Sequence, residues 1–169
     1  TQSNISSFDS HEDLIAVADY SSHYYILHDH ECIAKGELTE HARSVAIGKV
    51  KGEYNIVYGH SDGFITIQKF NLEDKAITAE IKVNLYESLR QYLIDNNETV
   101  DSSLLENIDK KQRNVENIKI TPDGRVFSSL KRFIPYFRLE KANENITKLQ
   151  DYFLTVHRIQ HLDVHYKVE

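Results

Sequence analysis

The sequence predicts a single α+β domain, in which a meander-like antiparallel sheet precedes two or three helices. Short apolar runs separated by polar breaks recur through residues 1–83, a pattern typical of strands. The spacing of the apolar residues then becomes helical over residues 84–113. With 169 residues and 40 % apolar content, the chain has the size of one domain with its own core.

The N-terminal half divides into short strands. The predicted strands are 14–18, 24–27, 44–50, 54–58, 64–70 and 76–83. Asp62 and Gly63 lie between two β-branched runs and predict a tight hairpin, because both residue types tolerate positive φ. Apolar and polar residues alternate in 64–69 and 77–83, which predicts strands with one solvated face.

Three helices are predicted after residue 83. The first covers 84–95 and begins with a sequence that resembles a capping box. A shorter helix is predicted over 103–113. The third, from Asn143 to about residue 160, has the strongest pattern, because its apolar residues form one stripe and Asn143 can cap it.

A second hairpin is predicted between the second and third helices. Residues 121–124 (Thr-Pro-Asp-Gly) form a turn, since proline fixes φ and glycine tolerates positive φ. The segments 115–120 and 125–130 flank this turn as strands, and the alternation in 162–168 predicts a final strand. The single domain 1–169 is thus divided into mainly strands (1–83), a helical part (84–113), a basic hairpin region (114–141) and a helix plus strand (142–169).

Composition favours a soluble protein of a reducing compartment. Cys32 is the only cysteine, so no disulfide can form within the chain. No run approaches the roughly 18 consecutive apolar residues that cross a bilayer, and the polar N-terminus is unlike a signal peptide. We therefore expect a cytoplasmic protein without a membrane partner.

Positive charge is concentrated in residues 110–141. This segment holds nine of the 20 basic residues and three acids, a local charge of +6 in a chain of net charge −6. Cations neutralise phosphates or carboxylates, and aromatic rings stack on bases or fill apolar clefts. The residues expected to bind a partner are Lys110, Lys111, Arg113, Lys119, Arg125, Lys131, Arg132, Arg138, Lys141, Phe133, Tyr136 and Phe137. The alternative is that these cations pair with the chain's own acids.

One stretch suggests a repeated β-unit. Residues 44–67 carry Gly48, Gly59 and Gly63 at offsets that resemble the strand-turn-strand of FG-GAP-like and WD-like propeller blades, and 115–129 looks similar. A closed propeller needs at least about four blades of roughly 40 residues each, which would leave no room for the predicted helices. We therefore interpret the pattern as hairpin chemistry within the α+β domain.

A second resemblance points to metal-dependent chemistry. Asp62, followed by Glu80 and Lys82 on a later strand, resembles the PD-(D/E)xK nuclease core. In that core two carboxylates hold Mg²⁺ or Mn²⁺ and a lysine orients or activates water. Glu80 and Lys82 are two residues apart and should share a strand face, but Ser61 stands where the family usually has proline.

A weaker metal candidate lies earlier in the chain. His28, His30 and Cys32 alternate, so they would project from one face if they shared a strand, and their N and S atoms suit zinc. No fourth ligand has an obvious position, and solvent-facing histidines beside a thiol are the alternative.

The function that these observations favour is a non-enzymatic regulatory binding protein, which engages nucleic acid or an acidic protein through residues 110–141. No cofactor is expected. One alternative is a metal-dependent nuclease that uses Asp62, Glu80 and Lys82 with Mg²⁺ or Mn²⁺. The other is a structural assembly subunit.

Overall fold

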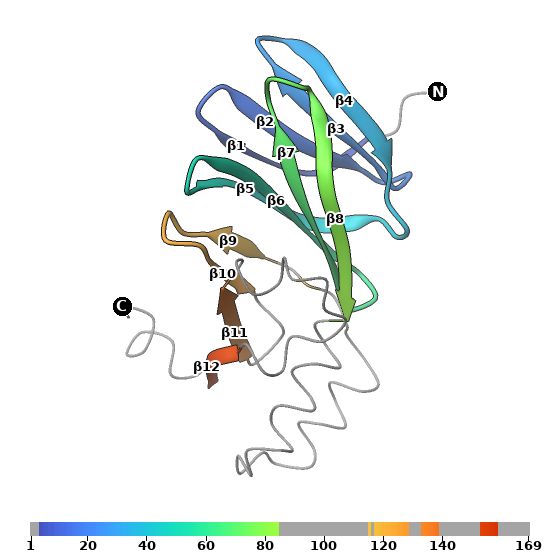
Figure 1. Ribbon diagram of the computed structural model, residues 1–169. Helices are drawn as coiled ribbons and strands as arrows, with labels where there is room; N and C mark the ends of the chain where they lie inside the picture. Colours follow the sequence, from blue (N-terminus) through green and yellow to red (C-terminus); the bar gives the residue numbers. More distant parts are fainter. Residues whose placement is uncertain (1–3, 85–114, 116, 129–132, 139–152, 159–169) are drawn as a thin grey trace.

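The computed structural model describes residues 4–84, 115, 117–128, 133–138 and 153–158, and within these residues every regular element is a β-strand. The strands form three four-stranded antiparallel sheets, and in each sheet the strand order follows the chain order or its reverse (Figure 1). We call them the first, middle and third sheets. The helices predicted by the α+β class are absent from the described part of the chain, so that prediction was wrong there.

The first sheet contains β1 (Ile5–His11), β2 (Leu14–Asp19), β3 (His23–His28) and β4 (Glu31–Glu37). The middle sheet contains β5 (Ala42–Val50), β6 (Glu53–His60), β7 (Phe64–Asn71) and β8 (Ala76–Asn84). The third sheet contains β9 (Ile118–Ile120), β10 (Arg125–Ser128), β11 (Phe133–Arg138) and β12 (Phe153–Arg158).

The six strands predicted in the N-terminal half are confirmed as β2, β3, β5, β6, β7 and β8. Gly63 has φ +87° in the turn between β6 and β7, as the predicted hairpin requires. The predicted hairpin around 121–124 is also confirmed, because β9 pairs with β10 and Gly124 has φ +88°. Pattern analysis missed β1 and β4, since both are rich in polar residues and gain their order from pairing in the sheet.

The third predicted helix is wrong where the structure describes it. Residues 153–158 form β12, which pairs antiparallel with β11 instead of continuing a helix. The apolar stripe over 143–160 suggested a helix, but aromatic and β-branched residues in this segment also suit a strand, and pairing with β11 decides the outcome. The other two predicted helices and the strand expected over 162–168 lie outside the described residues.

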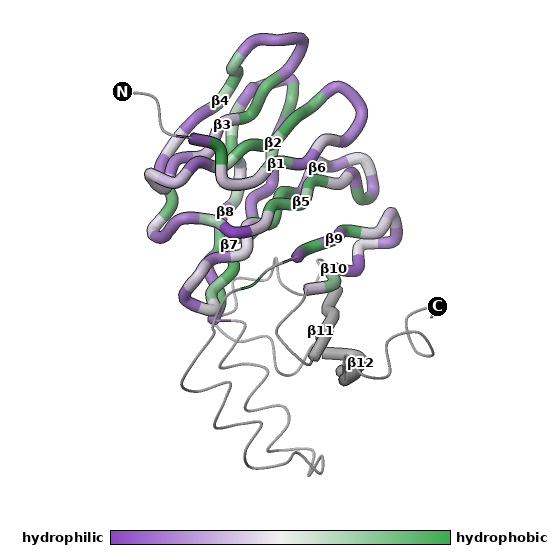
Figure 2. Tube along the Cα trace, turned by 180° about the vertical axis from the view of Figure 1, so that it is seen from behind, coloured by the Kyte–Doolittle hydropathy of each residue, from purple (hydrophilic) through white to green (hydrophobic). Residues whose placement is uncertain are grey.

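The first sheet packs face to face on the middle sheet. Their shared core contains Leu14, Ala16, Ala18, Ile26, Val45, Ile47, Tyr54, Ile56, Tyr58 and Phe70. Hydrogen bonds join the first strands of the two sheets: Asp9 accepts from the Ile47 backbone at 3.0 Å, and the Ser6 hydroxyl donates to the Ala42 carbonyl at 2.7 Å. Figure 2 shows hydrophobic residues along these packed strands and hydrophilic residues at the hairpin turns.

The middle sheet also packs on the third sheet, so both of its faces are covered. Gly59 lies so close to this contact that a Cβ atom there would meet Ser44 Oγ at 2.4 Å and Val115 Cγ1 at 2.7 Å. Val115 donates its backbone N–H to His60 at 3.0 Å and accepts from the Ser44 hydroxyl at 2.7 Å. The absence of a side chain at Gly59 therefore sets the distance between the middle sheet and the segment that leads into the third sheet.

Candidate functional site

The described part of the basic segment forms most of the third sheet. Its register places Phe127 opposite Lys119 on one side and opposite Tyr136 on the other. Arg125 lies opposite Arg138. Basic and aromatic positions far apart in sequence are therefore neighbours across three strands.

The third sheet turns different residues toward its two faces. Ile118 and Val126 are buried against the middle sheet, whereas Lys119 is exposed. Because strand residues alternate, Arg125 and Phe127 lie on the same face as Lys119, away from the middle sheet. We call this surface the far face, and define it by Lys119, Arg125 and Phe127 together with the strand positions of Tyr136 and Arg138.

Arg125 is held by the turn that precedes it. Its guanidinium lies 2.9 Å from an Asp123 carboxylate oxygen, and only 15 % of the side chain is exposed. Hydrogen bonds from Thr121 and from Arg125 lower the pKa of Asp123. Part of the basic charge is thus neutralised within the chain. This agrees with the alternative that the cations of this segment pair with the chain's own acids.

Of the other predicted binding residues, four lie on β11 and six lie outside the described residues. Phe133, Tyr136, Phe137 and Arg138 occupy positions on β11. Lys110, Lys111, Arg113, Lys131, Arg132 and Lys141 lie outside the described residues.

The residues of the nuclease hypothesis are engaged in other contacts. Glu80 and Lys82 do share the face of β8 that points toward the first sheet, since they lie opposite Gln68 and Thr66. Glu80 accepts a hydrogen bond from the Gln68 amide at 3.3 Å.

Lys82 and Asp62 also make contacts within the chain. The Lys82 ammonium donates to Thr39 Oγ1 and lies 4.6 Å from the centre of the Phe64 ring. Asp62 accepts the backbone N–H of Phe64 at 3.1 Å, which closes the turn. Within the described part of the chain, no three His, Cys, Asp or Glu residues are grouped so that they could hold a metal ion.

The zinc candidate is divided by a hairpin. His28 ends β3, Asp29 and His30 have positive φ in the turn, and Cys32 lies on β4 opposite Leu27. The three residues therefore do not share one extended strand, which was the premise of that hypothesis.

His60 is a buried polar residue that sequence patterns did not single out. Its Nδ1 lies 2.8 Å from the Glu40 carbonyl oxygen, and its Nε2 lies 2.7 Å from Thr66 Oγ1. Burial lowers the pKa of His60, although Asp62 opposes this shift. The imidazole therefore joins the β4–β5 connection to β7 as a neutral group.

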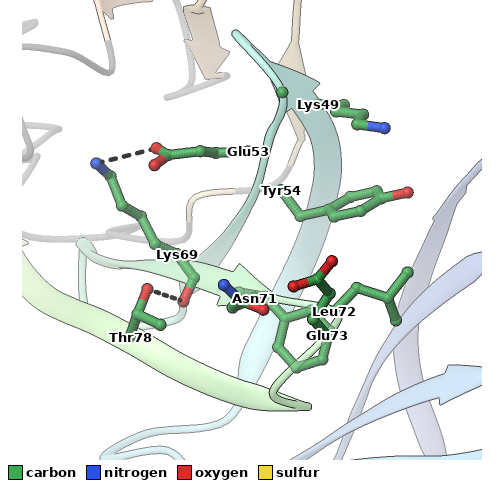
Figure 3. A pocket seen from close by; sticks show the side chains of 10 residues that line it. Lys49, Glu53, Tyr54, Lys69, Asn71, Leu72, Glu73 and Thr78 are labelled. Atoms are coloured by element: carbon green, nitrogen blue, oxygen red, sulfur yellow. Dashed lines mark hydrogen bonds and ion pairs between the residues drawn. The ribbon is translucent and has the colours of Figure 1, made fainter.

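A cavity of about 360 Å³ opens at the end of the middle sheet (Figure 3). Tyr54 and Phe70 contribute buried aromatic surface, and Leu72 adds an aliphatic side chain. Lys69 at its wall lies 3.3 Å from Glu53. The cavity combines apolar surface with paired charges, and it lies at the hairpin turns of the middle sheet.

A second lysine at this cavity is also paired. Lys49 lies 3.6 Å from Glu12 and 5.2 Å from the centre of the Tyr54 ring. The Tyr54 hydroxyl donates to Glu12 at 2.9 Å, and this hydrogen bond is the main cause of the lowered pKa of Glu12. These contacts link the β1–β2 turn to the middle sheet.

Comparison with known proteins finds similarity in structure alone. No family model matches the chain, and no curated protein matches it. No helix within the described residues is long and apolar enough to cross a membrane.

Solved WD40 structures resemble this fold. The crystal structure of RRP9 WD40 repeats matches with a TM-score of 0.56 and 10 % identity, over 94 % of this chain and 39 % of that chain. The structure of U3-55K matches with a TM-score of 0.56 and 9 % identity, over 92 % of this chain and 39 % of that chain. This chain thus spans well under half the length of either. The described part of the chain shares the fold of consecutive WD40-type blades, which corrects our rejection of a propeller-like arrangement.

Proposed function

We propose that this chain is a non-enzymatic binding protein of regulatory type that uses residues 110–141 to engage nucleic acid or an acidic protein surface. The observation that carries the proposal is the far face of the third sheet. There, Lys119 lies opposite Phe127, Phe127 lies opposite the Tyr136 position, and Arg125 lies opposite Arg138.

This arrangement suits an extended anionic partner. A cation on a sheet face can contact phosphate or carboxylate groups, while neighbouring aromatic residues offer ring faces for stacking. The exposed cation in the described part of this face is Lys119, whereas Arg125 is held by Asp123. We therefore assign direct contact with the partner to Lys119 and a positioning role to Arg125.

The contacts of Asp62, Glu80 and Lys82 support a non-enzymatic function over a nuclease. Each of the three makes a hydrogen bond within the chain, with Phe64, Gln68 and Thr39 respectively. The fold similarity to WD40 repeats is compatible with a binding role, but at about 10 % identity it concerns the fold only.

The test measures binding of labelled single-stranded RNA and DNA over a range of salt, with and without Mg²⁺ or Mn²⁺. We expect binding that weakens with salt, and the salt slope should decrease by about 0.7 for each lost contact with a single strand. Lys119→Glu and the double variant Lys131→Glu/Arg132→Glu should each reduce affinity.

Lys75→Glu is the matched control, because Lys75 is exposed in the β7–β8 turn, away from the third sheet. It makes the same charge change and should leave binding within twofold. Binding to an acidic protein but to neither nucleic acid would select the second partner class. Metal-dependent cleavage that Glu80→Ala abolishes would overturn the proposal in favour of the nuclease.

A further inference from the structure

A small cavity, which we call the notch, lies where the first strands of the first and middle sheets begin. It has a volume of about 110 Å³ and is lined by Ser6, Tyr20, His41, Ala42 and Arg43. Three stretches of the chain supply these residues: the start of β1, the residue that follows β2, and the connection from β4 into the start of β5. Pockets that enclose a whole drug-sized ligand measure at least roughly 300 Å³, so the notch has room for one chemical group of a larger molecule.

Two β-bulges form the wall of the notch. The register of β1 with β2 skips one residue, Ser6, and the register of β5 with β6 skips Arg43 in the same way. A bulge bends its strand and redirects a side chain, and bulges are common next to functional sites. The two bulges lie side by side, since the Ser6 hydroxyl donates to the Ala42 carbonyl at 2.7 Å. The same irregularity in two neighbouring sheets therefore places both side chains at one cavity.

Arg43 is a cation without a partner in the described part of the chain. Its side chain is exposed, and it makes no ion pair with any described carboxylate. The acids next to the notch residues in sequence are already engaged: Asp19 accepts two backbone N–H groups that follow it in the chain, and Glu40 accepts the His41 backbone N–H at 3.2 Å. The Arg43 guanidinium can therefore bind an anion from solvent.

Tyr20 adds an exposed aromatic ring to the notch. Its side chain is 61 % exposed, and its ring centre lies 6.1 Å from that of His41 with 44° between the ring planes. The backbone at Tyr20 is held in place, because its N–H donates to the Asn4 carbonyl at 3.0 Å. An exposed ring beside an unpaired guanidinium suits a ligand that carries a flat ring and an anionic group together.

We infer that the notch binds one nucleotide unit of a single-stranded nucleic acid, with the phosphate at Arg43 and the base stacked on Tyr20. A nucleotide supplies both groups from one unit, whereas an acidic residue of a protein supplies a carboxylate without a ring. The choice of nucleic acid as partner rests on the proposed function. The site itself rests on the paired bulges, the unpaired cation and the exposed ring, on a surface separate from the far face of the third sheet.

The first test adds adenosine 5′-monophosphate, adenosine or inorganic phosphate to the ¹⁵N-labelled full chain and follows backbone amide shifts by NMR. We expect the monophosphate to shift the amides of residues 20 and 41–43. Saturation should need about tenfold less of it than of adenosine or inorganic phosphate, because only the monophosphate contacts both Arg43 and Tyr20. In Arg43→Gln the three compounds should differ by about twofold or less, since the phosphate contact is lost.

The second test measures binding of a labelled single-stranded RNA. Tyr20→Ala should raise the Kd about fivefold or more, whereas Tyr20→Phe keeps the ring and should stay within about twofold of the wild-type chain. Arg43→Gln should also raise the Kd about fivefold or more and reduce the salt slope by about 0.7. Lys75→Gln is the matched control, because it makes the same charge change in the β7–β8 turn, at the opposite end of the middle sheet. Circular dichroism should show that every variant keeps the fold.

The outcomes separate this inference from the proposed function. Unshifted amides at residues 20 and 41–43, or shifts that are the same in Arg43→Gln, would overturn the inference. Shifts with short polyglutamate but not with the monophosphate would also overturn it, in favour of an acidic protein partner. RNA binding that Lys119→Glu weakens but Tyr20→Ala and Arg43→Gln leave unchanged would reject the notch and keep the far face. Binding of the monophosphate at the notch, together with RNA binding that Lys119→Glu leaves unchanged, would keep the notch and reject the far face.

Discussion

The first and middle sheets have the same four-stranded antiparallel plan, but only the middle sheet is covered on both faces by described parts of the chain. The difference is visible in their strands. In β7, the third strand of the middle sheet, residues 65–68 and Phe70 are buried, whereas β3, the third strand of the first sheet, has a single buried residue, Ile26. A sheet with two neighbours needs long apolar runs, while a sheet with one neighbour tolerates polar and half-exposed residues. The predictions below test this contrast between the two sheets.

The largest expected effect concerns equivalent isoleucines in the two sheets. Ile56 on β6 is fully buried, and Ile15 on β2 is 37 % exposed at the corresponding position. We expect Ile56→Ala to lower the free energy of unfolding by about 3–4 kcal/mol, because it leaves a cavity in a closed core. Ile15→Ala should cost under about 1 kcal/mol, because its side chain already contacts water. Urea denaturation of both variants measures the difference, and equal losses would contradict the contrast.

The next effect concerns the distance between the middle and third sheets. Gly59→Ala places a Cβ atom 2.4 Å from Ser44 Oγ and 2.7 Å from Val115 Cγ1. We expect a loss of about 2–3 kcal/mol, since overpacking forces backbone and side chains to shift. Gly52→Ala is the control, because no atom lies within 4 Å of its added Cβ and only its φ of +81° opposes the change. Its loss should be about 1 kcal/mol. Thermal unfolding of both variants measures these losses, and an equal shift in Tm would argue against close packing at Gly59.

Acid should act on the two sheets in different pH ranges, through the last residues of β2 and β6. Burial raises the pKa of Asp19, but hydrogen bonds from His23, Tyr25 and Ser21 outweigh it, so the pKa is lowered. Burial lowers the pKa of His60. Each group binds protons more weakly in the folded state, so each contributes stability that is lost as pH falls. The contribution of His60 begins to fall below about pH 6.5, and that of Asp19 below about pH 3.8.

Two variants separate these ranges. His60→Gln should remove the loss of stability that begins below about pH 6.5 and leave the loss that begins below about pH 3.8 intact. Asp19→Asn should lower the free energy of unfolding at pH 7 by about 1–3 kcal/mol and flatten the acid limb. The measurement is the free energy of unfolding as a function of pH. A curve that is unchanged in either variant would show that the replaced residue does not contribute to the pH dependence of stability.

The smallest expected effect is at the cavity. Glu53→Gln breaks the contact of 3.3 Å with Lys69, but the Glu53 side chain is 61 % exposed. We expect a change in the free energy of unfolding of about 0.5 kcal/mol or less, because solvent and salt screen such pairs. A loss above 1 kcal/mol would show that the covered sheet depends on its charged rim as well as on its core.

The sequence predicted the strands of the middle sheet best because their apolar runs and the turn at Asp62 and Gly63 are local signals. It failed over 153–158, where an apolar stripe suits a helix but pairing with β11 makes these residues a strand. The resemblance of 44–67 to propeller blades agrees with the WD40-like fold, but we set it aside because we assumed that a closed ring must fit within 169 residues. For the site, the charge of 110–141 was visible in the sequence. The register that sets Lys119 beside Phe127 was not, because it depends on pairing between strands.

The order of strands within each sheet has a consequence for how the chain folds. Because every sheet is made of consecutive strands, each hairpin closes a short loop before any contact between sheets is needed. The sheets then add stability as neighbours in a row, in the manner of repeat proteins. Amide protons of β6 and β7, which belong to the sheet with two neighbours, should therefore exchange with solvent most slowly among the described strands. Those of β4, at a sheet edge, should exchange early, in openings that leave the rest of the molecule folded.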